Sequence, residues 1–339
     1  MSSLQIIWFF LIGFILTVYA ILDGFDLGVG FWHLFTKKDE ERRLLLTSIG
    51  PVWDGNEVWL ITGGAVIFSA FPQVYAAVFS GLYIPFMLLL FALIFRAVSV
   101  EFRGRVPSPR WRNFWDTAFA AGSIISAFLF SIAFGNILRG LPLDESKNFT
   151  GTLPGLLNPY AVLIGLLGFS MFITHGALYL VLKTEGHISK LSRNWVQKGW
   201  YTYIGIFIIT DAVTIITQPQ LLNNYRVLPI LWILPIFTLV LISMIGFFNW
   251  KGKPIKAFLS SVLSIAGLMA MSGAALFPNI VPALNNPRLS LTIMNSSSTE
   301  LTLKTILIIT ILGIPLVIGY TIWLYRTFGG KVKIIKDVY

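Results

Sequence analysis

The chain has 339 residues, of which 56% are hydrophobic and 12% are charged, and its formal net charge is +10. A water-soluble domain of this length would carry about 25% charged residues. The composition therefore indicates an integral membrane protein, and we attribute the basic excess to loops at a membrane surface rather than to nucleic-acid binding. Cysteine is absent, which excludes disulfides, thiolate metal sites and iron–sulfur clusters.

About 20 consecutive apolar residues suffice to cross a bilayer as a helix. The sequence predicts an all-α membrane protein with about nine transmembrane helices in one polytopic domain, 1–339. We also expect two four-helix bundles plus one extra helix, with halves at about 1–140 and 155–339. The predicted helices, in chain order, are 4–34, 52–71, 75–98, 116–138, 159–183, 199–217, 227–249, 256–277 and 301–326.

Basic residues orient these helices. Of the 25 Lys and Arg residues, 20 fall in connections on one side of the predicted membrane, counting Arg96 among them, and five fall on the other side. Because basic loops stay in the cytoplasm, we expect the N-terminus outside and the C-terminus inside the cell.

Two pairs of acids interrupt apolar helices on the predicted cytoplasmic side. Asp23 and Asp26 lie in the inner half of the first helix, and Asp54 and Glu57 open the second. Each pair has the i, i+3 spacing that places both side chains on one helix face. An ionised carboxylate at a bilayer centre costs roughly 2.5–3.5 kcal/mol. We therefore expect these four acids to have a function.

Acids that lie together away from water can take up and release protons, as a proton relay requires. Structural alternatives remain open for both pairs. Asp54 and Glu57 could favour the start of their helix through its dipole, and Asp23 or Asp26 could pair with Arg or Lys from an inner loop.

The three histidines, His33, His175 and His187, lie in different segments, so the sequence predicts no local haem or metal site. His175, in the inner half of the fifth helix, is a weaker candidate for the proton pathway; an interhelical hydrogen bond explains it equally well. Gly24 and Gly28 form a small-xxx-small pair that predicts close packing with another helix.

At this point the sequence resembles subunit II of the cytochrome bd-type quinol oxidases over essentially its whole length. The two longest matching motifs are residues 22–30 (LDGFDLGVG) and 51–61 (PVWDGNEVWLI). Further matches are 75–81 (YAAVFSG), 95–103, 111–116 (WRNFWD), 133–136 (AFGN), 157–159 (LNP) and 301–303 (LTL).

The resemblance implies that the chain binds no haem itself and pairs with a subunit I that carries two haems b and one haem d. That complex oxidises quinol and reduces dioxygen in a bacterial or archaeal cell membrane. In this family subunit II is credited with proton delivery from the cytoplasm, and Asp54 matches the acid of that route. Asp23 and Asp26 match its other acidic motif. Position 57 is Glu here and a neutral amide in some members, which favours a supporting entrance role for Glu57.

In some members subunit II also holds a structural quinone or is joined by a small single-helix subunit, and no motif in this chain decides either point. Two other functions fit acids in membrane helices. One is a proton- or cation-coupled secondary transporter, for which the expected inverted repeats are not evident. The other is a purely structural subunit whose acids only anchor helices.

Overall fold

A computed structural model describes residues 1–332 of the chain, which are almost entirely helical. The α-helices are α1 (Ser3–His33), α2 (Asp39–Ile49), α3 (Trp53–Ala70), α4 (Pro72–Gly81), α5 (Tyr83–Phe102), α6 (Pro109–Arg139), α7 (Leu153–Leu156), α8 (Pro159–Lys183), α9 (Gly186–Thr217), α10 (Asn223–Val227), α11 (Ile233–Trp250), α12 (Pro254–Leu276) and α13 (Glu300–Thr327). Three 3₁₀ turns, at Pro219–Leu222, Pro229–Trp232 and Pro287–Leu289, and a hairpin of β1 (Asn279–Val281) and β2 (Leu291–Thr292) complete the described part.

The expectation of an all-α membrane protein is confirmed. Eight helices of the described part are long and apolar enough to cross a membrane. A ninth, α3, has 18 residues and packs against α1, but its first turns carry Asp54 and Glu57 and so reduce its mean hydropathy. The predicted third span, 75–98, was wrong at its start, because the helix is interrupted at Leu82, between α4 and α5. The predicted start of the sixth span, residue 199, was also wrong, because α9 begins 13 residues earlier.

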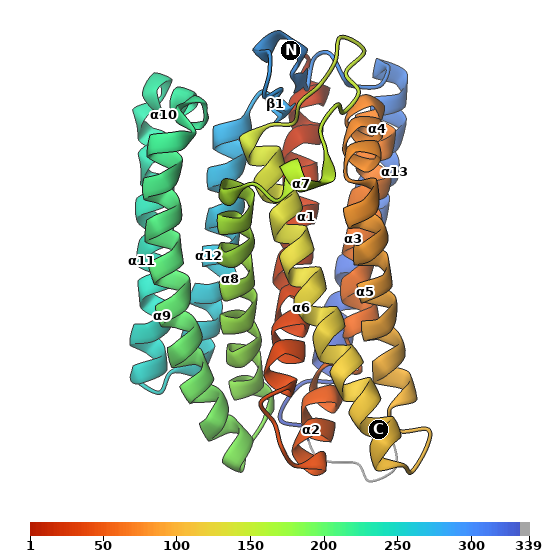
Figure 1. Ribbon diagram of the computed structural model, residues 1–339, viewed down its shortest axis with the longest axis vertical. Coiled ribbons are helices and arrows are strands. Elements are labelled where there is room, and N and C mark those ends of the chain that lie inside the picture. Colours follow the sequence, from red (N-terminus) through yellow and green to blue (C-terminus); the bar gives the residue numbers. More distant parts are fainter. Residues whose placement is uncertain (333–339) are drawn as a thin grey trace.

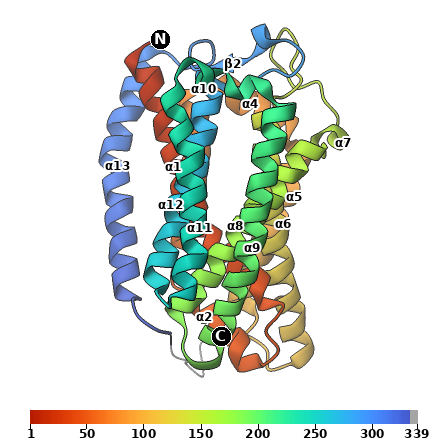
Figure 2. The same cartoon turned by 90° about the vertical axis from the view of Figure 1, so that its left-hand side faces the viewer.

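The long helices run side by side, with α1, α6 and α8 between two flanking groups (Figure 1). On one side α8 packs with α9 and α12, and α11 joins those two. On the other side α1 packs with α3 and α6, and α5 packs on α6. Helix α13 lies on the outside against α3 and α1 (Figure 2). We call the two ends of the molecule the α2 end and the hairpin end; the N-terminus lies at the hairpin end (Figure 1).

Helices α1 and α8 approach each other through glycines, as the small-xxx-small pair predicts. A side chain at Gly28 would overlap the backbone carbonyl of Phe172 and the backbone of Gly176 on α8. Without Cβ atoms at this crossing the two backbones come into direct contact. This close contact fixes the half of α1 nearer the α2 end, which carries Asp23 and Asp26, in the middle of the bundle.

Candidate functional site

The two acids of α1 lie in the interior. Asp23 and Asp26 are both 0% exposed. They face Arg96 of α5, whose side chain is 1% exposed and whose Nη2 lies 2.6 Å from Asp23 Oδ1 and 3.7 Å from Asp26 Oδ2. The i, i+3 spacing thus places the two carboxylates on one face, as expected, and this face meets a buried guanidinium.

The assignment of Arg96 to a cytoplasmic connection was wrong. Helix α5 continues to Phe102, so Arg96 lies inside it. Its Nη1 donates to Glu57 Oε1 of α3 at 3.0 Å, so the planar guanidinium joins acids from two other helices through its two terminal nitrogens. An arginine is costly within a membrane unless it is paired, and here three carboxylates surround it. We call Asp23, Asp26, Glu57 and Arg96 the Arg96 cluster.

Asp54 does not join the Arg96 cluster. It lies in the first turn of α3, is exposed, and makes no hydrogen bond or ion pair with any residue of the described part. Glu57, one turn further on, is intermediate, with 23% of its side chain exposed. The acids therefore form a series from the surface inward: Asp54, then Glu57, then the buried pair on α1.

Neutral side chains complete the surroundings of the α1 acids. Tyr19 donates its hydroxyl to Asp23 Oδ2 at 2.9 Å. The Asn56 amide donates to Asp26 Oδ2 at 2.8 Å and to the Leu22 carbonyl at 3.2 Å. On its other side, Asn56 Oδ1 accepts from the hydroxyl of Tyr325 on α13 at 2.9 Å.

No functional role for Arg96 or Tyr325 was expected from the sequence. A signal for Arg96 was present in the apolar pattern, which continues on both sides of it. No local pattern marks Tyr325, because its partner is 269 positions away in the chain.

His175 of α8 lies apart from the acids and is hydrogen-bonded at both ring nitrogens. Nδ1 contacts Ser261 Oγ at 2.9 Å, and Nε2 lies 3.1 Å from the Ile21 carbonyl oxygen. The imidazole is fully buried and stacks on Phe258 at a centroid distance of 4.7 Å. This geometry matches the interhelical hydrogen bond considered above; a role for His175 in proton transfer stays a prediction.

A second charged cluster ties α1 and α2 to the α5–α6 turn. Asp116 of α6 accepts from Arg103 Nε and contacts His33 Nε2, each at 2.6 Å, and Arg103 also binds Asp39 of α2 at 2.7 Å. Partial burial raises the pKa of Asp39, but the hydrogen bond and charge of Arg103, with Arg112 and Arg43, hold it below its usual value. This network of ion pairs holds the end of α1 and the start of α2 against the segment between α5 and α6.

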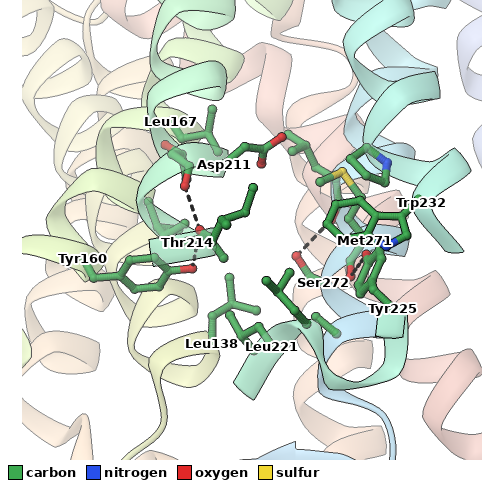
Figure 3. A pocket seen from close by; sticks show the side chains of 17 residues that line it. Leu138, Tyr160, Leu167, Asp211, Thr214, Leu221, Tyr225, Trp232, Met271 and Ser272 are labelled. Carbon is green, nitrogen blue, oxygen red and sulfur yellow. Dashed lines mark hydrogen bonds between the residues drawn. The ribbon is translucent and has the colours of Figure 1, made fainter. Parts of the chain in front are cut away.

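Toward the hairpin end, Asp211 of α9 borders a mostly apolar cavity of about 120 Å³. Figure 3 shows Asp211 and Thr214 on one wall and Trp232 and Tyr225 on the opposite wall. Thr214 bonds to the Tyr160 hydroxyl at 3.0 Å. This cavity is separate from the Arg96 cluster, which lies nearer the α2 end.

Metal-binding chemistry is not evident in the residues 1–332 that the structure describes, where no three His, Asp or Glu side chains are grouped so as to hold an ion. Each histidine is engaged within the chain: His33 with Asp116, His175 with Ser261, and His187 with Glu41 at 2.9 Å.

Fold and site together define a multi-span helical membrane protein with a buried charge cluster in its core. Residues 4–328 match the family described as cytochrome bd terminal oxidase subunit II. The chain belongs to this family. Its members are subunits of an oxidoreductase complex of the bacterial inner membrane, and the sequence-based family assignment is confirmed.

Comparison with individual relatives agrees with this family assignment. The chain is 34% identical over 360 residues to the Escherichia coli K12 cytochrome bd-I ubiquinol oxidase subunit 2, covering 97% of this chain and 95% of that one. It is 34% identical over 335 residues to the Bacillus subtilis cytochrome bd ubiquinol oxidase subunit 2, covering 98% of each. Its fold is similar to a chain of the bd oxidase from Geobacillus thermodenitrificans, with a TM-score of 0.79 at 18% identity, over 96% of this chain and 99% of that one.

Proposed function

We propose that this chain is the subunit of a quinol:oxygen oxidoreductase that supports a haem-bearing subunit I and supplies it with protons from the cytoplasm. The observation that carries the proton role is the series of acids on α3 and α1. Asp54 is exposed, Glu57 is half-buried, and Asp23 and Asp26 are fully buried. A proton taken up at the surface can therefore pass inward between titratable groups without leaving the protein.

The α2 end is the cytoplasmic end in this proposal. The basic residues Lys37 and Lys38 precede α2, Arg105 lies in the turn between α5 and α6, and Arg110 lies in the first turn of α6 at the same end. This concentration of positive charge favours the cytoplasmic side, as in the sequence-based orientation. Moving Arg96 from a connection into α5 leaves that asymmetry in place.

Arg96 narrows the roles that the acids can have. A carboxylate held 2.6 Å from a buried guanidinium is stabilised in its ionised form, so Asp23 acts as a counter-ion. Asp54 has no such partner in the described part of the chain and is the group best suited to exchange protons with water. We therefore assign proton entry to Asp54, transfer to Glu57, and the fixed charge to Asp23 and Arg96.

Subunit I is expected to cover the exposed side of α3. An ionised acid facing lipid costs roughly 2.5–3.5 kcal/mol, so the face that carries Asp54 lies against water or a partner protein. Family membership supplies the partner, and we place the two haems b and one haem d in it. The transporter alternative loses its basis, because the family is that of oxidase subunits.

Replacement of Asp54 by Asn tests the proton role. In the purified two-subunit complex, D54N is expected to slow oxygen consumption by roughly tenfold or more, since loss of a proton-transfer group costs about 10²–10⁴ in rate. The haem absorbance bands are expected to be unchanged, because Asp54 makes no contact that supports the described fold. E101Q is the matched control: Glu101 is an exposed acid at the end of α5 that likewise has no ion pair among the described residues. Normal turnover of D54N with intact haems would contradict the assignment.

A further inference from the structure

The two buried acids of α1 have different surroundings. Asp23 accepts at both oxygens, from Arg96 Nη2 at 2.6 Å and from the Tyr19 hydroxyl at 2.9 Å. Asp26 accepts only at Oδ2, from the neutral amide of Asn56 at 2.8 Å, with Arg96 at 3.7 Å. Its Oδ1 is buried and has no hydrogen-bond partner among the described residues. Both oxygens of Asp23 therefore have a hydrogen-bond donor, whereas only one oxygen of Asp26 has one.

The charges around Asp26 do not balance if all acids are ionised. The titratable groups that face it are Arg96 of α5, Asp23 on its own helix, Glu57 of α3, Tyr325 of α13 and Tyr179 of α8. Arg96 is the one cation in this set, and its short contacts go to Asp23 and Glu57. A third negative charge in the same buried space would lack a counter-ion, which is strongly unfavourable away from water.

We infer that Asp26 holds a proton in the resting protein, on its unpartnered oxygen Oδ1, while Asp23 remains the ionised counter-ion of Arg96. With the proton bound to Asp26, the Arg96 guanidinium faces two carboxylates and one neutral acid. When Asp26 gives the proton to an acceptor, the guanidinium faces three carboxylates. The inference deepens the proposed proton-uptake role, and it rests on that role for its meaning, because a stored proton is useful only to a proton-consuming partner.

Tyr325 is a positioning residue for this site. Its hydroxyl donates to Asn56 Oδ1 and so fixes the amide with its NH₂ group toward Asp26 Oδ2. With Oδ2 occupied by a donor, Oδ1 is the oxygen left to carry the proton. Without the Tyr325 hydroxyl the Asn56 carbonyl oxygen loses its donor, and the amide is held only by the bonds of its NH₂ group to Asp26 and Leu22, which changes the hydrogen bonding of the acid without removing it.

Infrared spectroscopy of the purified complex tests the inference, since a protonated carboxyl group has a C=O stretch that a carboxylate lacks and that shifts in D₂O. D26N is expected to remove one such band. Y325F is expected to shift the band, whereas Y320F, a change to an exposed tyrosine of α13 with no hydroxyl partner among the described residues, leaves it unchanged. A D26N spectrum that retains every protonated-acid band would overturn the inference.

Two further measurements test the inference if the D26N variant does not assemble. D26E keeps an acid at the site and is expected to displace the band. In the unmodified complex, ¹³C-labelled aspartate is expected to shift the band; an unshifted spectrum would overturn the inference. None of these readings requires turnover. A protonated Asp26 together with normal turnover of D54N would refute the uptake role and leave the proton site standing, whereas slow turnover of D54N with an ionised Asp26 would do the reverse.

Discussion

Replacing Arg96 by Met tests whether the Arg96 cluster holds the fold together. Met has a similar length but no charge, so R96M leaves Asp23, Asp26 and Glu57 in the core without their cation. Arg96 is 1% exposed and contacts two of these acids at 2.6 and 3.0 Å. Removing one partner of a buried ion pair costs roughly 3–5 kcal/mol. A loss of this size is a large fraction of the stability of a typical domain, and we expect little folded R96M to accumulate.

The assay is the amount of assembled complex in the membrane, followed by its thermal unfolding in detergent. R105M is the matched control, because Arg105 lies a few residues beyond α5 and is exposed. The double variant R96M/D23N removes one of the stranded carboxylates and is expected to recover part of the loss. If R96M assembles and unfolds like R105M, the acids do not depend on the guanidinium and our account of the cluster is incorrect.

Three other predictions concern the helix contacts. G28L inserts a side chain where α1 touches the backbone of α8 and is expected to abolish assembly, whereas G13L, on a part of α1 with nothing within 4 Å, is tolerated; immunoblotting of membranes distinguishes them. K331M removes an ammonium that donates to two carbonyls at the end of α8, at 2.8 and 3.1 Å, and is expected to cost about 0.3–1 kcal/mol, measured as a lower unfolding temperature. Because the folded pKa of Asp39 is depressed, its contribution to stability is present above the unfolded value of about 3.9 and is lost as the pH falls through the folded value. D39N is therefore expected to unfold at a lower temperature at neutral pH and to show a flatter decline in acid; identical pH profiles would contradict this.

Much of the fold could be predicted from hydropathy alone. The helix at Pro159–Lys183 matches its predicted range, and the first and last long helices agree within one residue at each end. Apolar length is a local property, so the sequence is sufficient for it. The start of α9 was missed because its first three to four turns are largely polar and extend beyond the apolar segment.

The candidate site could be predicted in part. The spacing of Asp23 and Asp26 placed them correctly on one face. The position of Arg96 was missed, although the apolar pattern continues on both sides of it, because counting charges assigns an arginine to a loop whenever the membrane would penalise it. Three acids from two other helices remove that penalty, and such pairing depends on contacts between distant segments. For the same reason the sequence could not separate Asp54, which faces outward, from Glu57 only three positions later.

Proton entry from the α2 end through Asp54 is the step on which the proposed function depends. The most direct measurement is proton uptake by the complex in liposomes, with a pH-sensitive dye in the compartment that faces the α2 end and an oxygen pulse to start turnover. We expect rapid uptake from that compartment in the unmodified complex and in E101Q, and uptake slowed by roughly tenfold or more in D54N. Equal uptake rates in all three, or uptake from the opposite compartment, would contradict it.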